Sequence, residues 1–403
     1  TNLQFIRKGN DLIITDNVET QTNRVILSKY FKNKSKLNDY TQNGEDKKIL
    51  EQTFYYAGKG NIKGTNYNDA IVGSDKKDTI RSYAGNDTIM GGLLNDKIYS
   101  GKGENTILIN NGDGHDTLYV DKDATSNTVK FDIGDSVAYS KSGKDLVITA
   151  TNGAKSTDVQ ALTIKNYFTK TGYDAIKSDI NVGKVGETDV EDLRTVLAED
   201  GVTVTGSTKK ANKLYGAKDY NNTITGGDKN DVIYAGDFSN RISGGKGNDK
   251  YYVESENITA KTLIFDESGN DTYYVDSLDT SVYIQDTQGT KDVLKIDEDI
   301  RYTMFFDVSV KEGVDQYDSL FIVDRANIQD KAYTEYTAGG VEIANFFDGN
   351  KYGDGRIEKI IVTIQHLKSG NACIPRLWAV RDAARLVRLG LSLKYHSVSK
   401  LPA

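Results

Sequence analysis

The chain has 403 residues, enough for two or three domains that each bury a core. Only 37% of the residues are hydrophobic, and the 38 Gly, 25 Tyr and 2 Pro are typical of strands joined by turns. The net charge of −7 argues against a nucleic-acid partner, the single cysteine permits no internal disulfide, and no run approaches the roughly 18 apolar residues of a transmembrane segment.

Residues 1–31 alternate apolar and polar positions on both sides of a Gly-Asn-Asp turn. This pattern predicts a β-hairpin followed by a third strand. The polar start is no signal peptide, so we expect either a fragment or a chain exported without an N-terminal signal. The same order recurs at residues 137–168, and a weaker third copy is expected at 301–347.

Two of these modules end in an aromatic pair, Tyr30 with Phe31 and Tyr167 with Phe168. We expect the pairs to be core plugs that cap a neighbouring open edge, and ligand binding is the alternative. Phe168 has the same alternating phase as Ile164, which predicts that Phe168 points inward. The same phase predicts that Tyr167 lies on the opposite face, where its hydroxyl reaches water.

Residues 64–108 divide into five nine-residue lines: GTNYNDAIV, GSDKKDTIR, SYAGNDTIM, GGLLNDKIY and SGKGENTIL. Each line has Asp or Asn at its sixth place and Ile at its eighth, and a sixth line, NGDGHDTLY, follows after a two-residue slip. Gly, Asn and Asp suit a turn, whereas the x-Ile-x triplet fits a short strand with one inward side chain. Each line is therefore predicted to form half a coil of a narrow solenoid.

Lines eighteen residues apart are expected to stack, which places Asp69 near Asp87 and Asp78 near Asp96. Stacked carboxylates repel each other unless a cation lies between them, and the glycine-rich turns add free backbone carbonyls. Carboxylate and carbonyl oxygens are the ligands that Ca²⁺ prefers. We therefore expect Ca²⁺ ligands at Asp69, Asp78, Asp87, Asp96 and Asp116.

These lines resemble the haemolysin-type, or RTX, calcium-binding repeat GGxGxDxUx. Residues 244–252, GGKGNDKYY, match every constrained place with Tyr as U, whereas most other lines lack one or more glycines. The hairpins are similar to the GNDL…NYF modules found beside such repeats. The resemblance covers most of residues 1–360. It implies an all-β fold of two parallel β-roll arrays, joined and capped by hairpin modules, with a few short helices.

The second array contains three lines in unbroken phase at residues 226–252. Asp231 and Asp249 lie eighteen residues apart in its most glycine-rich lines and form the best predicted site. Asn222 and Asn240 take the sixth place on the other side, where a neutral amide predicts weak or no binding. The expected metal ligands of this array are Gly226, Gly227, Asp231, Gly244, Gly245, Gly247, Asp249 and Asp271.

The remaining segments complete the predicted organisation. The expected domains are 1–60 (hairpin cap and connector), 61–120 (first array), 121–200 (second hairpin module and connector, with a helical fragment at 190–200), 201–300 (second array), 301–372 (third module) and 373–403 (basic tail). The tail has six Lys or Arg and one acidic residue. The family resemblance suggests an export signal there; a segment of different origin and a capping helix are the alternatives.

Catalytic motifs are missing from the sequence: it has no H-E-x-x-H, no G-x-S-x-G, no C-x-x-C and no P-loop. We therefore expect no enzyme in this chain. The resemblance implies a bacterial protein exported by a type I secretion system, with Ca²⁺ and the secretion machinery as partners. A surface-layer or adhesin role, with binding to a cell-surface glycan or self-assembly, is favoured. The alternatives are the repeat region of a pore-forming cytotoxin and the targeting part of a secreted enzyme.

Overall fold

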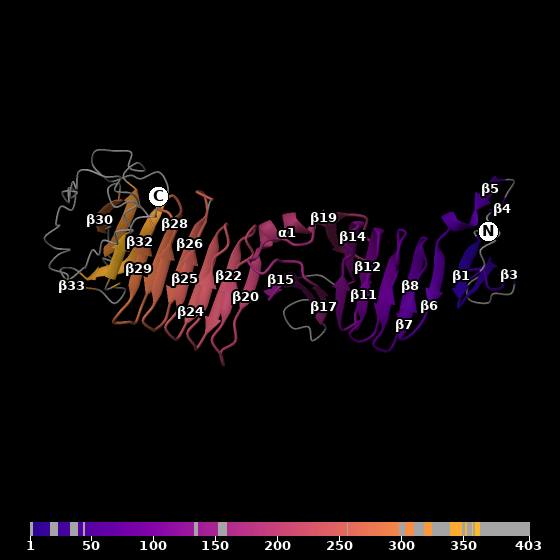
Figure 1. The fold of residues 1–403 in the computed structure, drawn as a ribbon, viewed down its shortest axis with the longest axis horizontal. Helices are drawn as coiled ribbons and strands as arrows, with labels where there is room; N and C mark the ends of the chain where they lie inside the picture. Colours follow the sequence, from indigo (N-terminus) through magenta and orange to yellow (C-terminus); the bar gives the residue numbers. More distant parts are fainter. Residues whose placement is uncertain are drawn as a thin grey trace, which may run out of the picture. The chain divides into compact units, whose positions relative to one another are not determined.

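The computed structural model describes residues 3–16, 23–32, 39–42, 45–132, 136–151, 159–255, 257–297, 303–309, 318–324, 339–348, 351–352, 357 and 359–362. These residues form a mainly β structure with one short α-helix (Figure 1). Unit 1 comprises residues 1–140, 144–168 and 175–200, and unit 2 comprises 141–143, 169–174 and 201–403. Together the units contain about 11 turns of β-solenoid between residues 61 and 296.

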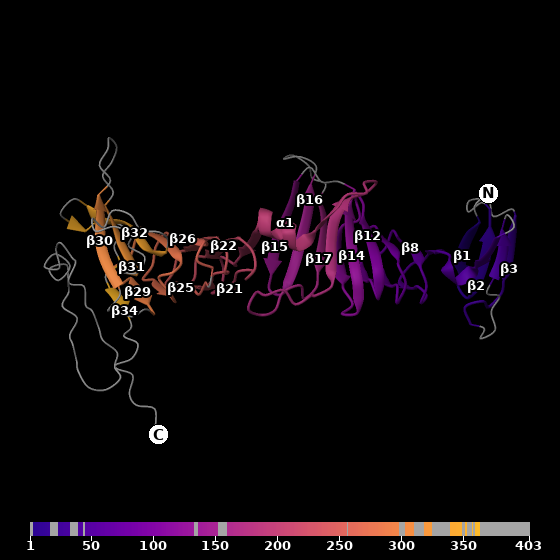
Figure 2. The same cartoon turned by 90° about the horizontal axis from the view of Figure 1, so that it is seen from above.

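One sheet of unit 1 contains ten strands. Their order is β19 (Val190–Asp192), β18 (Asp179–Lys184), β14 (Ala124–Phe131), β12 (Gly103–Ile109), β10 (Thr88–Gly92), β8 (Asp69–Ser74), β6 (Phe54–Ala57), β1 (Gln4–Lys8), β2 (Asp11–Thr15) and β3 (Arg24–Leu27). Neighbours from β18 to β1 pair in parallel. Figure 2 shows β8, β12 and β14 following one another along this sheet.

The opposite wall of unit 1 is also built from parallel strands. It contains β7 (Asn61–Lys63), β9 (Thr79–Arg81), β11 (Lys97–Tyr99), β13 (His115–Tyr119) and β17 (Val159–Ile164), followed by β16 (Asp145–Thr151) and β15 (Ser136–Ser142). The eighth-place residues stack in register, with Ile71 beside Ile89 on one wall and Ile80 beside Ile98 on the other. These four side chains are at most 1% exposed, which confirms the predicted inward isoleucines.

The first hairpin module continues the ten-stranded sheet. Phe5 of β1 pairs with Phe54 of β6, and the rings of Phe31 and Phe54 meet edge to face at 5.4 Å. Tyr30 is 3% exposed, and Phe31 is half-buried against the same cluster. The aromatic pair therefore packs on the strand that precedes the first repeat, as a cap would. Two further short elements, the hairpin β4 (Asp39–Gln42) with β5 (Glu45–Lys48) and a 3-10 turn (Ile49–Glu51), lie between β3 and β6.

In the second hairpin module β17 pairs antiparallel with β16 and parallel with β13. Phe168 is fully buried, as predicted. The prediction for Tyr167 was wrong, because its side chain is 1% exposed and packs edge to face on Phe168 at 4.8 Å. Strand β17 ends at Ile164, and Asn166 has a φ of 53°, so the strand alternation does not extend to Tyr167.

The connector after this module is more ordered than its polar composition indicated. Strand β18 pairs in parallel with β14, and β19 follows it in antiparallel pairing. The predicted helix is present as α1 (Leu193–Asp200). Asp192 Oδ1 accepts hydrogen bonds from the backbone N–H groups of Arg194 and Thr195, at 2.9 and 3.2 Å, which satisfies two free donors of the first turn.

Unit 2 repeats the two-walled arrangement. One wall contains β20 (Val202–Thr205), β22 (Asn222–Gly227), β24 (Asn240–Gly245), β26 (Lys261–Asp266), β28 (Ser281–Asp286), β32 (Gly340–Asp348), β31 (Asp318–Asp324) and β30 (Thr303–Ser309), with β33 (Lys351–Tyr352) beside β32. The other contains β21 (Lys213–Tyr215), β23 (Val232–Tyr234), β25 (Lys250–Val253), β27 (Thr272–Val275), β29 (Val293–Ile296) and β34 (Lys359–Val362).

The described residues of the expected third module at 301–347 form strands. Strands β30, β31 and β32 are antiparallel neighbours, and β32 joins β28 in parallel, the same connection that β17 makes with β13. The basic tail predicted at 373–403 lies outside the described residues. Within the described residues, no helix combines the length and the apolar character that crossing a membrane requires.

Candidate metal centres

The sixth-place aspartates lie inside the solenoid. Seven of the eight start or immediately precede the short strand that carries the inward eighth-place residue, and Asp116 is the second residue of β13, so the sixth-place and eighth-place side chains point to the same side. All eight predicted aspartates are at most 3% exposed: Asp69, Asp78, Asp87, Asp96 and Asp116 in unit 1, and Asp231, Asp249 and Asp271 in unit 2. Burial of so many carboxylates requires partners for their oxygens.

The backbone of the preceding turn provides a hydrogen-bond donor for one oxygen of the carboxylate. The N–H of Asp69 donates to Oδ1 of Asp87 at 2.8 Å, and the N–H of Asp78 donates to Oδ1 of Asp96 at 2.7 Å. The predicted stacking of these pairs is therefore confirmed. The same bond links Asp96 to Asp116, Asp231 to Asp249, Asp249 to Asp271 and Asp271 to Asp292, at 2.6–2.8 Å.

In Asp69 and Asp78 the second carboxylate oxygen accepts a hydrogen bond from the backbone N–H of Thr65 and of Ser74, respectively. In the other six aspartates it is left without a partner. Oδ2 is buried without a hydrogen-bond partner in Asp87, Asp96, Asp116, Asp231, Asp249 and Asp271. A buried oxygen without a partner costs on the order of 1–3 kcal/mol, and native structures contain few of them. Their recurrence at one place of the repeat indicates a ligand that is itself repeated.

Two of the predicted glycines, Gly226 and Gly244, lie against these oxygens. A Cβ added at Gly226 would lie 2.6 Å from Asp231 Oδ2 and would also overlap the carbonyl oxygen of Gly244. Gly245 and Gly247 have φ values of +96° and +124°, which other residues rarely adopt. The absence of side chains here keeps backbone carbonyls and carboxylates within the same small space. An all-oxygen donor set of this kind fits Ca²⁺.

The electrostatics of the buried ladder also favour a cation. Burial raises the pKa of Asp87 to about 7, and the neighbouring Asp69 carboxylate contributes to that shift. Burial likewise raises the pKa of Asp116 and Asp249 to about 7 and that of Asp69 to about 6. A divalent cation between the carboxylates would favour their charged forms and reverse these shifts.

The other side of the second array is closed by amides. Asn222 Nδ2 donates to Asn240 Oδ1 at 3.0 Å and to the carbonyl oxygen of Ala217 at 2.9 Å. Asn240 Nδ2 donates to the carbonyl oxygen of Gly236 and to Thr262 Oγ1, at 3.0 and 3.1 Å. These amides satisfy one another and the backbone, and weak or no calcium binding on this side stays a prediction.

Three buried aspartates near the end of the array were missed by the sequence reasoning. Asp266 and Asp286 end strands β26 and β28, and Asp292 precedes β29. They complete two triads, Asp249–Asp266–Asp271 and Asp271–Asp286–Asp292, whose ligand oxygens lie within 4.8 Å of one another. The available signal was the buried alternating strand that ends in Asp in both segments, TLIFD and VYIQD.

Comparison with known families supports the assignment from geometry. A model of four copies of the RTX calcium-binding nonapeptide repeat matches residues 63–98 and 217–254. The chain carries RTX calcium-binding repeats. The RTX matches include the sixth-place aspartates from Asp69 to Asp96, together with Asp231 and Asp249. The second match ends before Asp266 and Asp286 of the triads. Ca²⁺ is a structural ligand of RTX repeats, and the RTX family is typical of type I secreted extracellular proteins. None of the curated proteins matches the chain.

Proposed function

We propose that the chain is a calcium-stabilised, non-catalytic extracellular module of a bacterial protein exported by a type I secretion system. The observation that carries this proposal is the ladder of buried Oδ2 atoms without hydrogen-bond partners in the RTX turns. The carboxylates of one ladder come from successive turns, so only the wound solenoid brings them together. Calcium therefore binds the folded chain in preference to the unfolded chain and stabilises it by mass action.

This coupling suits one-step export. A chain whose arrays are stabilised by calcium is less stable without the ion and folds most readily where the ion is abundant. The test is circular dichroism of the whole chain, first stripped of calcium and then titrated with Ca²⁺, with Mg²⁺ as the matched control. We expect the circular dichroism signal of β-strands and the melting temperature to increase with Ca²⁺ and not with equimolar Mg²⁺. An identical melting temperature in all three conditions would contradict the proposal.

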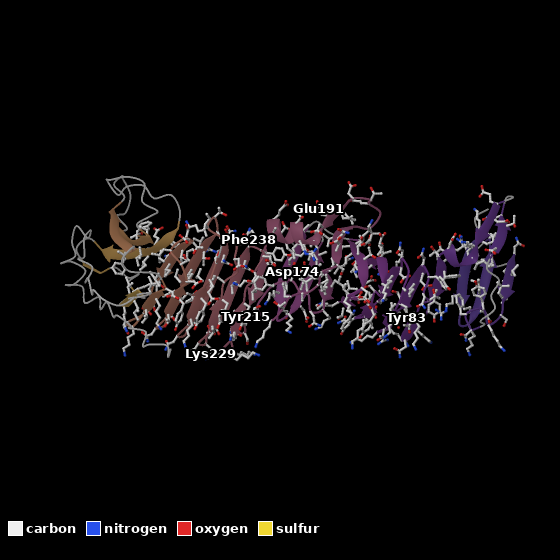
Figure 3. The ribbon with its side chains drawn as sticks, turned by 45° about the horizontal axis from the view of Figure 1, so that its top comes forward. Tyr83, Asp174, Glu191, Tyr215, Lys229 and Phe238 are labelled. Atoms are coloured by element: carbon white, nitrogen blue, oxygen red, sulfur yellow. The ribbon has the colours of Figure 1, made fainter. Side chains whose placement is uncertain are left out.

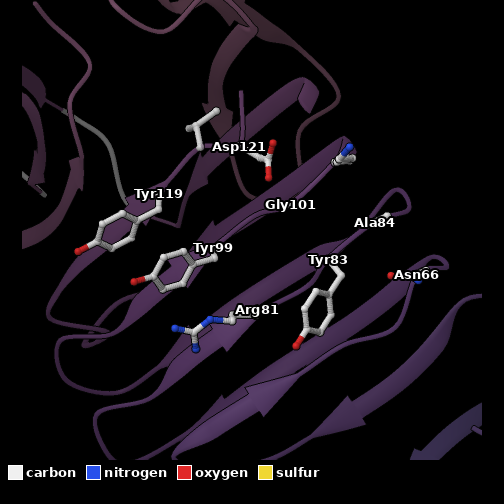
Figure 4. Close-up of a pocket in the computed structure, with 10 residues that line it drawn as sticks. Asn66, Arg81, Tyr83, Ala84, Tyr99, Gly101, Tyr119 and Asp121 are labelled. Carbon is white, nitrogen blue, oxygen red and sulfur yellow. The ribbon is translucent and has the colours of Figure 1, made fainter. Parts of the chain in front are cut away.

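We further propose a surface-layer or adhesin role, because the outer faces of the solenoid present aromatic side chains. Tyr83 and Phe238 are 42% and 40% exposed (Figure 3). In unit 1 the rings of Tyr99 and Tyr119 stack at 4.4 Å, and the Arg81 guanidinium lies 4.5 Å from the Tyr99 ring centre. An open hollow of about 480 Å³ is lined by Arg81, Tyr83, Tyr99 and Tyr119 (Figure 4).

The hollow combines aromatic surface with Arg81, Asn66 and Asp121, a combination that offers both apolar contact and hydrogen bonds to a polar ligand. A cell-surface glycan has that chemistry. Cosedimentation with purified cell-wall glycan tests the role: Tyr83→Ala is expected to lower the bound fraction at unchanged melting temperature. Tyr234→Ala, which alters the tyrosine stack of unit 2, is the control and is expected to bind like the unaltered chain. Equal binding by all three proteins would remove the hollow as the adhesive surface.

The two alternatives named from the sequence, the repeat region of a cytotoxin and the targeting part of a secreted enzyme, use the same calcium-dependent module. They differ from an adhesin in what the module attaches to. Glycan binding by this chain alone supports the adhesin role. A chain whose stability does not depend on calcium would contradict all three roles: adhesin, cytotoxin repeat region and enzyme-targeting part.

A further inference from the structure

The last described turns of the second array hold five buried carboxylates in one place. Asp249, Asp266, Asp271, Asp286 and Asp292 are each at most 2% exposed, and they form two triads that have Asp271 in common. The RTX pattern accounts for the sixth-place members of these triads. It does not account for Asp266 and Asp286.

Asp266 and Asp286 stand where the repeat has its first glycine. Phe265 pairs with Ser243 across neighbouring strands, so Asp266 takes the position of Gly244 one turn later. Asp286 pairs with Asp266 and takes that position again on the following turn. Two successive turns have therefore replaced the small first-place residue by an inward carboxylate.

Each added carboxylate is matched by a tyrosine at the eighth place. The Tyr251 hydroxyl donates to Asp266 Oδ2, and the Tyr273 hydroxyl donates to Asp286 Oδ2 at 2.8 Å. Both rings are fully buried and stack at 5.0 Å. One turn earlier the eighth place is Ile233, which has no hydroxyl. The tyrosines hold one oxygen of each added carboxylate and fix its orientation.

Two oxygens within the triads have no hydrogen-bond partner from the protein. Oδ2 of Asp249 and Oδ2 of Asp271 are buried without a hydrogen-bond partner. Burial, followed by the charge of Asp266, raises the pKa of Asp271 to about 8. Burial, followed by the charge of Asp292, raises the pKa of Asp286 to about 8. Carboxylates packed this closely repel one another unless a cation neutralises them.

We propose that the five carboxylates bind two Ca²⁺ ions that share Asp271, in a class of site distinct from the glycine-carbonyl sites of the RTX repeats. Three carboxylates supply three charged ligands to each ion, so these sites depend less on backbone carbonyls. Ca²⁺ accepts six to eight oxygens in flexible geometry, whereas Mg²⁺ requires a near-ideal octahedron and retains several waters, which a site buried among side chains does not favour. This inference rests on the proposed calcium binding and deepens it.

The charge of the triads sets the order of filling. Affinity in oxygen-ligand calcium sites rises with the number of charged ligands. Each triad has three carboxylates, so we expect these two sites to fill before the repeat sites. Because Asp271 contributes to both, binding of the first ion orients a ligand of the second.

The test counts the calcium ions bound by the whole chain, using native mass spectrometry together with equilibrium dialysis. Asp266→Asn and Asp286→Asn are each expected to lose one ion, and Asp271→Asn two, at a calcium concentration that fills the unaltered protein. Asp279→Asn removes the same charge from an exposed position of the same turns and is expected to lose none. The affinity lost should be about tenfold or more, since affinity follows ligand charge.

Three outcomes are distinguishable. The expected ion counts support the shared two-ion centre. Unchanged counts in Asp266→Asn and Asp286→Asn, in a protein that still binds calcium, overturn the centre and leave the proposed RTX function intact. An unaltered protein that binds no calcium overturns both.

A second measurement does not depend on altered carboxylates. Tb³⁺ replaces Ca²⁺ in oxygen sites, and its emission is sensitised by nearby tyrosine. In the whole chain, Tyr251→Phe combined with Tyr273→Phe should remove most of the sensitised emission at the first two equivalents of Tb³⁺. The control, Tyr252→Phe combined with Tyr274→Phe, alters the adjacent tyrosine stack, which is only partly buried, and should retain it. Equal emission from both double variants would contradict placement of the first two ions beside Asp266 and Asp286.

Discussion

The backbone N–H of Asp231 donates a 2.7 Å hydrogen bond to Oδ1 of Asp249, which lies eighteen residues further along the chain. The bond holds one oxygen of Asp249 against the backbone of the preceding turn, while its other oxygen is buried without a partner. One carboxylate thus connects two turns and keeps a free ligand atom between them. The geometry of the metal ladder is therefore built into the pairing of the backbone.

Asp231 belongs to neither triad, and its replacement by Asn is expected to weaken calcium binding at the repeat site. The amide keeps the shape of the side chain and loses its charge, so the calcium affinity of that site should fall about tenfold or more. Isothermal titration calorimetry measures the loss. A titration identical to that of the unaltered protein would mean that backbone carbonyls alone carry the affinity of this site.

Asn222→Ala should lower the stability of the fold and leave calcium affinity unchanged. Asn222 is 4% exposed and donates hydrogen bonds to Asn240, Ala217 and Tyr220. Its loss leaves buried acceptors unsatisfied and should lower the free energy of unfolding by about 1–3 kcal/mol. Calcium affinity should not change, because this side of the array is closed by amides. Urea unfolding and calorimetry on the same sample separate the two effects, and a reduced calcium affinity would show that the amide side also binds the ion.

The calcium-free protein should become less stable as pH rises from 5 to 8. Burial raises the pKa of Asp87 and Asp116 to about 7 and that of Asp271 to about 8, from an ordinary value of 3.8. In this window the folded chain holds protons that the unfolded chain has released, so folding stability is lost as pH rises through the raised pKa values. Melting curves in calcium-free buffer measure this dependence.

Saturating calcium should reverse the sign of that dependence, since protons compete with the ion for the same oxygens. The two series of melting curves share buffers and protein concentration, so the calcium-bound series is the control for the calcium-free series. A calcium-free melting temperature that rises between pH 5 and pH 8 would show that the buried carboxylates are already neutralised within the protein.

Phe168→Ala should lower the free energy of unfolding by about 3–5 kcal/mol, through lost contacts and the cavity left behind. Phe168 is fully buried and packs on Tyr167. Tyr83→Ala removes a side chain that is 42% exposed and should change stability by less than about 0.5 kcal/mol. Urea unfolding midpoints compare the two variants. An unchanged midpoint for Phe168→Ala would return the aromatic pair to the ligand-binding alternative.

The repeat was readable from sequence wherever one residue type recurs at one separation. The inward Ile89 and the stacking of Asp69 on Asp87 both follow from the nine-residue period, because backbone pairing converts a fixed separation into a spatial neighbour. Tyr167 was misplaced because strand alternation was carried past the end of β17 at Ile164. A local pattern holds only as far as the element that creates it.

The triads could not be read in the same way. Asp249 and Asp271 are 22 residues apart, and Asp271 and Asp292 are 21 apart, so the period is broken where the triads lie. Asp266 stands at a place where the motif has glycine, and its role depends on Tyr251, fifteen residues away. Only the three-dimensional structure shows that the aspartate at the first place, Asp266, is paired with the tyrosine at the eighth place, Tyr251.

The spacing between successive ladder aspartates is 18, 20, 22 or 21 residues, yet the same backbone-to-carboxylate bond joins each pair. The additional residues are therefore accommodated at corners of the coil, as in the segment after β25, where Ile258 is 59% exposed. Such a corner can lengthen without moving the ligands on either side of it. Foreign peptides grafted at such corners would be displayed along the solenoid at intervals set by the spacing of its paired strands. The length of each grafted loop would not change the positions of the strands or of the ligands.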